Sequence, residues 1–278
     1  MRVDFHLHSR ASDGAHPATE MAAAAAAARL RHWSLTDHDT LAGWRTIAAA
    51  PGLIPGVELS TTWLGREVHI VGLGFRPDDA GLTNLLAANR KVRLTRLEAL
   101  INRLPTEART SITVASIAAE ANNGPEGSLG RNHLARALTR SGAVTGSQEA
   151  FARWLADEHL VDQDVPAFGS PADAAEVVRA AGGIAILAHP GCYGELPLIM
   201  ALMACGLDGI ETCHPNLSSQ LAQGLRKLAA RHGWLQSCGT DLHHLGVRRP
   251  GDCTLGAERL RPLLDRLVAE PGISPSGR

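Results

Sequence analysis

The sequence lacks the features that mark membrane-spanning and secreted proteins. No run of 18 apolar residues occurs in the 278-residue chain, and its first residues enter strand-like sequence without a basic segment followed by an apolar one. We therefore expect neither a membrane-spanning helix nor a signal peptide. The five cysteines include no CxxC pair and are odd in number, which is typical of free thiols in a reducing cytoplasm.

An excess of basic residues is also missing. Lys and Arg total 27 and Asp and Glu total 28, so the net charge is −1. This balance argues against broad electrostatic binding to long nucleic acid or to an anionic membrane, and leaves a small anionic ligand open. Neither a Ser-His-Asp nucleophile nor a phosphate-binding glycine loop stands out.

The chain does contain an alternation of strand-like and helix-like segments. Apolar residues make up 45% of it, enough for the core of one large domain or two ordinary ones. Strands that alternate with helices predict an α/β fold with a parallel sheet and helices outside it. Leu64 and Gly65 are predicted to join two strands in a hairpin. The seven predicted strands lie near Val3, Ser34, Val57, His69, Ile186, Ile210 and Gln236.

The pattern changes between residues 76 and 183. Strand signals vanish there, and helical spacing continues for over a hundred residues. This stretch is too long for a simple crossover, so it predicts a helical insertion, or cap, between strands four and five. The last residues, 271–278, are predicted to form a flexible tail.

Potential metal ligands occur at or near the end of most predicted strands. His6 and His8 lie two apart on the first strand, so both side chains face one side and can reach one ion. In a closed parallel barrel the carboxyl ends of the strands meet at one mouth, where active sites lie. The later strands carry Asp37, His38, Glu58, His69, His189, Glu211, His214, Asp241 and His243.

The segments DFHLHSRASDG, LTDHD, GVE, HIVG, AHP and GTDLH resemble, in order from residue 4 to residue 243, the motifs of the PHP family, the polymerase and histidinol phosphatase superfamily of phosphoesterases. The resemblance implies a distorted seven-stranded (β/α)7 barrel formed by residues 1–75 and 184–270. It also implies two or three divalent ions. Imidazole with carboxylate favours a borderline transition metal, most simply Mn²⁺, with Zn²⁺ and Fe²⁺ as alternatives.

Carried over by motif, the resemblance implies three ion sites that share one bridging carboxylate, Glu58. The first takes His6, His8, Glu58 and Asp241, the second takes Glu58, His69 and His189, and the third takes Asp13, His38 and His243. We also predict catalytic roles for Asp37 and His214. The alternative for Asp37 is to orient a ligand histidine, and His214 could donate a proton or contact phosphate.

The reaction implied is hydrolysis of a phosphate ester by a metal-bridging hydroxide, because clustered cations neutralise phosphate oxygens and lower the pKa of bound water. Within the predicted cap, GRNHLARAL places Arg131 and His133 at a helix start, which favours an anion. It resembles the GRxHxA signature of the subgroup that acts on nucleotides and short RNA ends. A surface charge is the alternative for Arg131. The segment NRKVRLTR adds Arg90, Lys91, Arg93 and Arg96, which would be a solvated helix face or a site for a second phosphate.

This subgroup resemblance predicts an enzyme that removes the 3′-phosphate from 3′,5′-bisphosphonucleotides, for example adenosine 3′,5′-bisphosphate. The alternatives are a 5′–3′ exoribonuclease on short RNA and, from a different class, a non-catalytic metal-binding regulator. The expected partners are a small phosphorylated nucleotide or short RNA. Neither a membrane nor a stable protein partner is expected.

Overall fold

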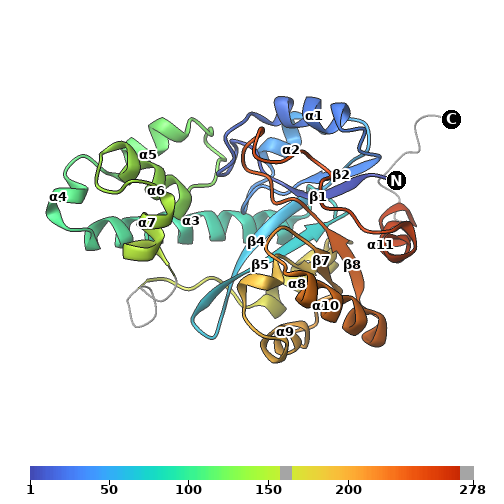
Figure 1. Cartoon of the computed structure of the whole chain (residues 1–278). Helices are drawn as coiled ribbons and strands as arrows, with labels where there is room; N and C mark the ends of the chain where they lie inside the picture. The colour runs from blue at the N-terminus through green and yellow to red at the C-terminus, as the bar shows by residue number, and fades with distance from the viewer. Residues whose placement is uncertain (157–164, 270–278) are drawn as a thin grey trace.

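The computed structural model describes residues 1–156 and 165–269. It has an α/β fold with two sheets, one parallel and one mixed (Figure 1). The smaller sheet is parallel and contains β1 (Val3–Leu7), β2 (His32–Leu35) and β3 (Leu53–Ile54). The larger sheet has the order β4 (Gly56–Trp63), β5 (Arg66–Leu73), β6 (Ile184–Leu187), β7 (Gly209–Cys213) and β8 (Leu235–Cys238).

The expectation of an all-parallel sheet is wrong at β5. This strand pairs antiparallel with both β4 and β6, whereas β6, β7 and β8 are parallel. The reason is the hairpin predicted at Leu64 and Gly65, which the structure confirms. Both residues have positive φ, 49° and 76°, and a two-residue turn can join only antiparallel neighbours. The described residues also contain one strand more than predicted, because Pro55 separates β3 from β4.

Backbone contacts join the two sheets at the ends of four strands. His8 N–H donates to the carbonyl of Leu242, 3.1 Å away, and Asp39 N–H donates to the carbonyl of Glu58, 2.9 Å away. Isolated parallel bridges form at the same places, between Leu7 and Leu242 and between His38 and Glu58. The ends of β1, β2 and β8 therefore meet next to β4, which is where most of the predicted ligands lie.

Six helices pack around the sheets: α1 (Ala18–Ala27), α2 (Ala42–Thr46), α8 (Pro171–Ala180), α9 (Leu196–Met203), α10 (Ser219–His232) and α11 (Ala257–Ala269). The alanine-rich helix α1 places Met21 and Ala25 against Trp33 of β2 in one apolar cluster. Helix α8 begins with a capping box between Ser170 and Asp173. All four residues of β6 are buried. One face of this strand packs with α8, α9 and α10, and the other packs with β1 and α11.

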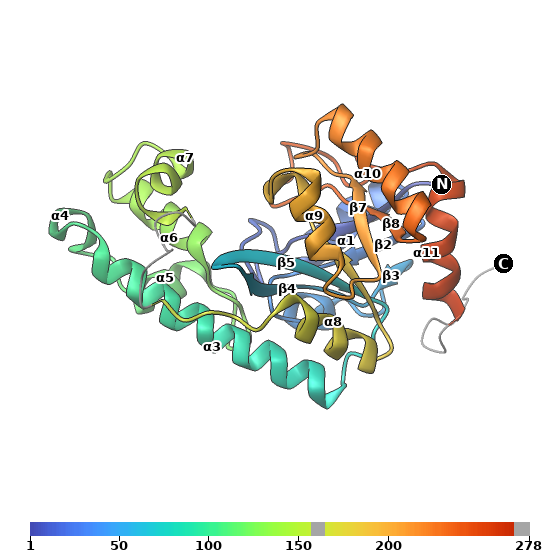
Figure 2. The same ribbon diagram turned by 90° about the horizontal axis from the view of Figure 1, so that it is seen from below.

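A group of helices lies to one side of the sheets (Figure 2): α3 (Ala80–Arg103), α4 (Thr106–Arg109), α5 (Val114–Ala121), α6 (Arg131–Arg140), α7 (Ser147–Ala150) and a π-helical turn, Phe151–Leu155. Helix α3 belongs to two apolar clusters. Leu82 packs with the sheet residues, and Leu97 packs with Leu134 of α6. This separate cluster is what a cap requires, and the division into domains stays a prediction.

Helix α8 lies inside the predicted insertion but packs on the sheet, because Ala175 and Val178 share a cluster with Val57 of β4. The predicted tail, 271–278, lies outside the described residues, as does the stretch 157–164 of the predicted cap. Among the described helices, none is long and apolar enough to cross a membrane.

Candidate metal centre and phosphate pocket

Five histidines surround the carboxylate of Glu58, which is buried on β4. Its Oε1 atom lies 2.8 Å from Nε2 of His189 and 3.1 Å from Nδ1 of His69, and its Oε2 atom lies 3.2 Å from Nε2 of His6, Nε2 of His8 and Nδ1 of His38. The side chains come from β1, β5, the end of β2 and the end of β6. Both oxygens of one carboxylate can therefore face separate sets of imidazoles.

Two aspartates complete the cluster on either side of His8. Oδ1 of Asp241 lies 3.2 Å from Nε2 of His8. Asp241 follows β8 with a φ of 49°, and its N–H donates to the carbonyl of His6 over 2.9 Å, which fixes this turn beside β1. Oδ1 of Asp13 lies 3.2 Å from Nε2 of His243, and Oδ2 lies 3.7 Å from Nε2 of His38. The structure thus brings the predicted ligands together.

The cluster fits a site for divalent metal ions. Several of its buried atoms have no hydrogen-bond partner among the described residues: Nε2 of His6, His8, His214 and His243, Nδ1 of His38 and Oε2 of Glu58. A buried polar atom without a partner costs free energy, and these atoms face one another. Imidazole nitrogen and carboxylate oxygen are the donors that transition metals take, so cations would satisfy them. The assignment of each residue to a particular ion stays a prediction.

The charges of the cluster stabilise one another. Burial alone would lower the pKa of His69 and His243, but Glu58 raises the first to about 9 and Asp13 raises the second to about 10. Burial alone would raise the pKa of Glu58 and Asp241, and the surrounding histidines hold both well below the usual range. The carboxylates are therefore ionised at neutral pH, and metal binding would release protons from the imidazoles.

Glu211 holds two members of the cluster. Its Oε1 atom lies 3.0 Å from Nδ1 of His6, and its Oε2 atom accepts a 2.6 Å hydrogen bond from the backbone N–H of His189. The Tyr193 hydroxyl lies 3.1 Å from Nδ1 of His189 and accepts from the N–H of His69. Each contact fixes the ring orientation or the backbone of a predicted ligand.

Asp37 serves the loop that carries Asp13. Its carboxylate accepts hydrogen bonds from the Ser9 N–H (2.8 Å), the Ser9 hydroxyl (2.7 Å) and the Ser12 hydroxyl (2.7 Å). These contacts hold the loop and do not reach a histidine ring, so the catalytic role of Asp37 and the alternative of orienting a ligand histidine both stay predictions.

His214, at the end of β7, points its Nε2 atom into the cluster. Its Nδ1 atom accepts a hydrogen bond from the N–H of Asn216, so the proton of the neutral ring belongs on Nε2. Nε2 lies 3.6 Å from Oδ2 of Asp241, and the side chain is fully buried. Nε2 of His214 therefore lies beside the predicted ligands, and its catalytic role stays a prediction.

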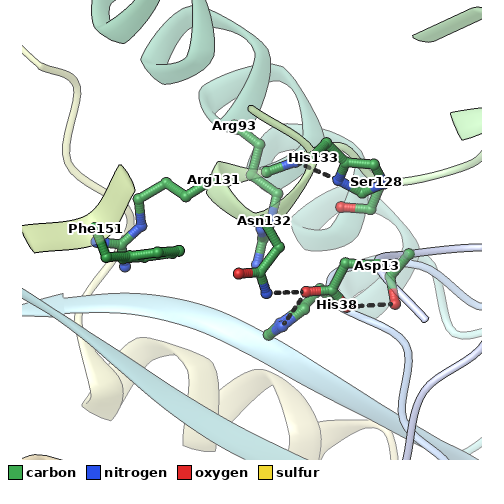
Figure 3. A pocket seen from close by; sticks show the side chains of 10 residues that line it. Asp13, His38, Arg93, Ser128, Arg131, Asn132, His133 and Phe151 are labelled. Carbon is green, nitrogen blue, oxygen red and sulfur yellow. Dashed lines mark hydrogen bonds and ion pairs between the residues drawn. The ribbon is translucent and has the colours of Figure 1, made fainter. Parts of the chain in front are cut away.

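A pocket of about 170 Å³ lies between the cluster and the helices (Figure 3). Its strand side contains Asp13 and His38 of the cluster, and its helical side contains Arg93 and Arg131. Asn132 at the start of α6 points to Asp13 and donates to its Oδ2 atom over 2.6 Å. The pocket thus joins the predicted metal centre to basic side chains of α3 and α6.

The two predicted substrate-binding residues differ in their surroundings. The Arg131 guanidinium lies 3.1 Å from Glu67 and 5.8 Å from the centre of the Phe151 ring, and it donates to the carbonyl of Leu155. Burial lowers the pKa of His133 to about 4, and its Nδ1 atom accepts from the N–H of Gly130 as part of the helix cap. A neutral, bonded His133 supports the helix start, and its contact with phosphate stays a prediction.

From the sequence alone, Arg93 was underrated and Asn89 and Glu67 were missed. Arg93 is buried, donates from Nε to Asp39 (2.5 Å) and from Nη2 to Ser60 (2.5 Å), and lines the pocket, which excludes a solvated helix face at this position. Asn89, one helical turn earlier, also donates to Asp39, and this spacing was the available signal. Glu67 was missed, although it lies two residues before His69 on one strand and therefore faces the same side.

Curated relatives of the chain are phosphoesterases. It is 34% identical to a 5′-3′ exoribonuclease of Haemophilus influenzae over 87% of this chain and 90% of that protein. It is 35% identical to a 3′,5′-nucleoside bisphosphate phosphatase of Chromobacterium violaceum over 88% of each chain. No protein-family model matches the sequence.

Two solved structures superpose on nearly the whole chain, both with a TM-score of 0.83. One, from Bifidobacterium adolescentis, is assigned as a metal-dependent phosphoesterase, is 27% identical and covers 99% of this chain and 98% of its own. The other is a protein from Chromobacterium violaceum named as an amidohydrolase, with bound sulfate. It is 33% identical and covers 97% of this chain and 96% of its own.

Proposed function

Because this chain belongs to the PHP family of metal-dependent phosphoesterases, we propose that it removes the 3′-phosphate from 3′,5′-bisphosphonucleotides. The chain is an enzyme that hydrolyses phosphate esters, and the choice of substrate is the part that we infer. The bisphosphate phosphatase from Chromobacterium violaceum is similar over 88% of both chains, which supports this substrate class.

The observation that carries the proposal is the pocket with two chemically different sides. One side holds Asp13 and His38 beside the other predicted ligands, and the opposite side holds Arg93 and Arg131. A substrate with two phosphates could place one at each side. The predicted cap, 76–183, would then supply the residues that read the second phosphate.

The arginine side is held rigidly, which suits recognition of phosphate. Two of the three guanidinium nitrogens of Arg93 are bonded to Asp39 and Ser60, and its Nη1 atom is close to Gly130 at the start of α6. Arginine presents several N–H donors in a fixed plane, which matches phosphate oxygens. Little side-chain freedom remains to be lost when a phosphate binds.

The ligand set would hold two or three divalent ions, for which we propose Mn²⁺, through His6, His8, Asp13, His38, Glu58, His69, His189, Asp241 and His243. Such ions neutralise phosphate oxygens and lower the pKa of bound water. His214 would donate its Nε2 proton to the leaving oxygen, because its Nδ1 atom is occupied by Asn216.

A 5′–3′ exoribonuclease is the second candidate function. The Haemophilus influenzae relative carries that name and is similar over 90% of its length. An exoribonuclease would use the arginines for the 5′-phosphate of RNA and cleave the next phosphodiester.

The test compares two substrates with Mn²⁺ present. Adenosine 3′,5′-bisphosphate should release phosphate with a kcat/KM at least about tenfold above that for cleavage of a 5′-phosphorylated RNA trimer, a difference of about 1.4 kcal/mol in transition-state binding. The reverse order would replace the phosphatase with the exoribonuclease. Absence of turnover of both, in protein that binds Mn²⁺, would mean that the substrate is another phosphate ester.

A further inference from the structure

Glu67 lies between the predicted metal centre and the arginines of the pocket. It is on β5, two residues before His69, and its side chain is only 7% exposed. Strand geometry turns both side chains to the same side. An ionised carboxylate at this depth needs partners, because burial of an unpaired charge is costly.

The two oxygens of Glu67 have different partners. Oε1 lies 2.9 Å from Nε2 of His69, and Oε2 lies 3.1 Å from Arg131 and 3.2 Å from Arg96. Arg96 is anchored in turn, because it donates to the carbonyl of Pro166 and its guanidinium lies 4.9 Å from the centre of the Phe168 ring. The arginines therefore fix one oxygen and leave the other for the imidazole.

His69 is oriented by this contact. When His69 binds a cation as a neutral ring, its proton would belong on Nε2, which faces the Glu67 carboxylate, and the lone pair on Nδ1, which lies 3.1 Å from Oε1 of Glu58, would be left for the cation. When a carboxylate accepts a hydrogen bond from the ring nitrogen that does not bind the metal, it raises the basicity of the ring nitrogen that does. The shortest contact of Glu67 is the one to His69. Ion pairs between Glu67 and the two arginines that only stabilised the fold would not need this contact.

We propose that Glu67 is a positioning residue that sets the affinity of the centre for metal by holding His69, while Arg96 and Arg131 hold Glu67. Glu67 itself is not one of the predicted ligands. The inference rests on His69 being a metal ligand, as set out under the proposed function.

The test is a titration of metal-stripped protein with Mn²⁺ in the absence of substrate, in which binding is measured by calorimetry. Glu67→Ala should weaken Mn²⁺ binding by about 10- to 100-fold, the usual cost of losing such a partner. Glu67→Gln should lose less than the alanine variant, because the amide oxygen still accepts from Nε2 of His69. Glu98→Gln is the matched control, because Glu98 is an exposed carboxylate on α3, and it should leave the affinity unchanged.

Enzyme assays supply the second readout. The Mn²⁺ concentration for half-maximal rate should rise in the same order of variants as the Mn²⁺ dissociation constant. A folded Glu67→Ala protein with wild-type Mn²⁺ affinity would overturn the inference. If that variant does not fold, unchanged affinity in Glu67→Gln would overturn it. Mn²⁺ binding is measured without turnover, so the role of Glu67 can still be tested if the proposed substrate is wrong.

Discussion

Both sides of the pocket bury charged side chains, but the polar atoms of these side chains have different partners. On the strand side, Nε2 of His6, Nε2 of His8 and Oε2 of Glu58 are buried without a hydrogen bond among the described residues. On the helical side, Arg93 pairs with Asp39 and Arg131 pairs with Glu67. Buried charges that pair with one another stabilise the structure of the pocket. Buried nitrogen and oxygen atoms that face one another without a hydrogen bond are suited to binding a cation.

This difference separates what each side should control. Changes on the strand side should alter metal content and turnover together. Changes at Arg131 should alter recognition of the substrate and leave the metal in place at saturating concentration, because Arg96 also pairs with Glu67. Changes at His133, which is bonded within the helical side, should alter stability.

The largest effect is expected at Glu58. Glu58→Gln replaces one of two charged oxygens shared by five histidines, and a neutral amide cannot balance two cations. Bound metal, measured by elemental analysis, should fall, and kcat should drop by more than the roughly 10- to 100-fold cost of losing a partner of a ligand. Glu176→Gln, an exposed carboxylate on α8, is the control. Unchanged metal content and rate would show that the bridge lies elsewhere.

Arg131 should give a smaller effect that depends on the substrate. Arg131→Ala removes a charge-assisted contact worth about 1.5–3 kcal/mol, so kcat/KM for a bisphosphonucleotide should fall about ten- to a hundredfold or slightly more. An aryl phosphate, which lacks the second phosphate, should lose much less.

The control for this variant is Arg140→Ala, at the other end of α6, where Arg140 is about half exposed and pairs with Glu120. Metal content at saturating Mn²⁺ should stay unchanged in both variants, because Arg96 still pairs with Glu67 when Arg131 is removed. Equal losses on the two substrates would mean that Arg131 serves the reacting phosphate or the fold and does not read a second phosphate.

The smallest effect on activity is expected at His133, where the change should appear in stability. Its pKa of about 4 in the folded protein lies below the ordinary 6.5, so the unfolded chain binds more protons between these values. The contribution of the buried neutral His133 to the free energy of unfolding is therefore complete above pH 6.5. It is lost as the pH falls towards 4, and the free energy of unfolding then decreases by about 1.4 kcal/mol per pH unit. His133→Gln keeps an acceptor for Gly130 N–H and should remove this slope. Urea unfolding of both proteins from pH 4 to 7 measures it, and parallel curves would contradict the burial of a neutral imidazole.

Much of the fold could be predicted from local patterns. The hairpin at Leu64 and Gly65 was predicted correctly, because its turn is set by two adjacent residues. The direction of β5 against β6 was not, because that pairing joins residues more than a hundred positions apart. Similarly, the placement of α8 on the sheet depends on which apolar face it meets, and its own sequence does not state this.

The candidate site divides in the same way. The sequence by itself determined which residues can bind metal, because imidazoles and carboxylates recur at strand ends and strand alternation turns His6 and His8 to one side. Only the tertiary structure decided that Arg93 is buried against Asp39, that His133 is neutral and that Glu67 joins His69 to two arginines. Those properties arise from desolvation and from charges on distant segments, and both exist only after the chain has packed.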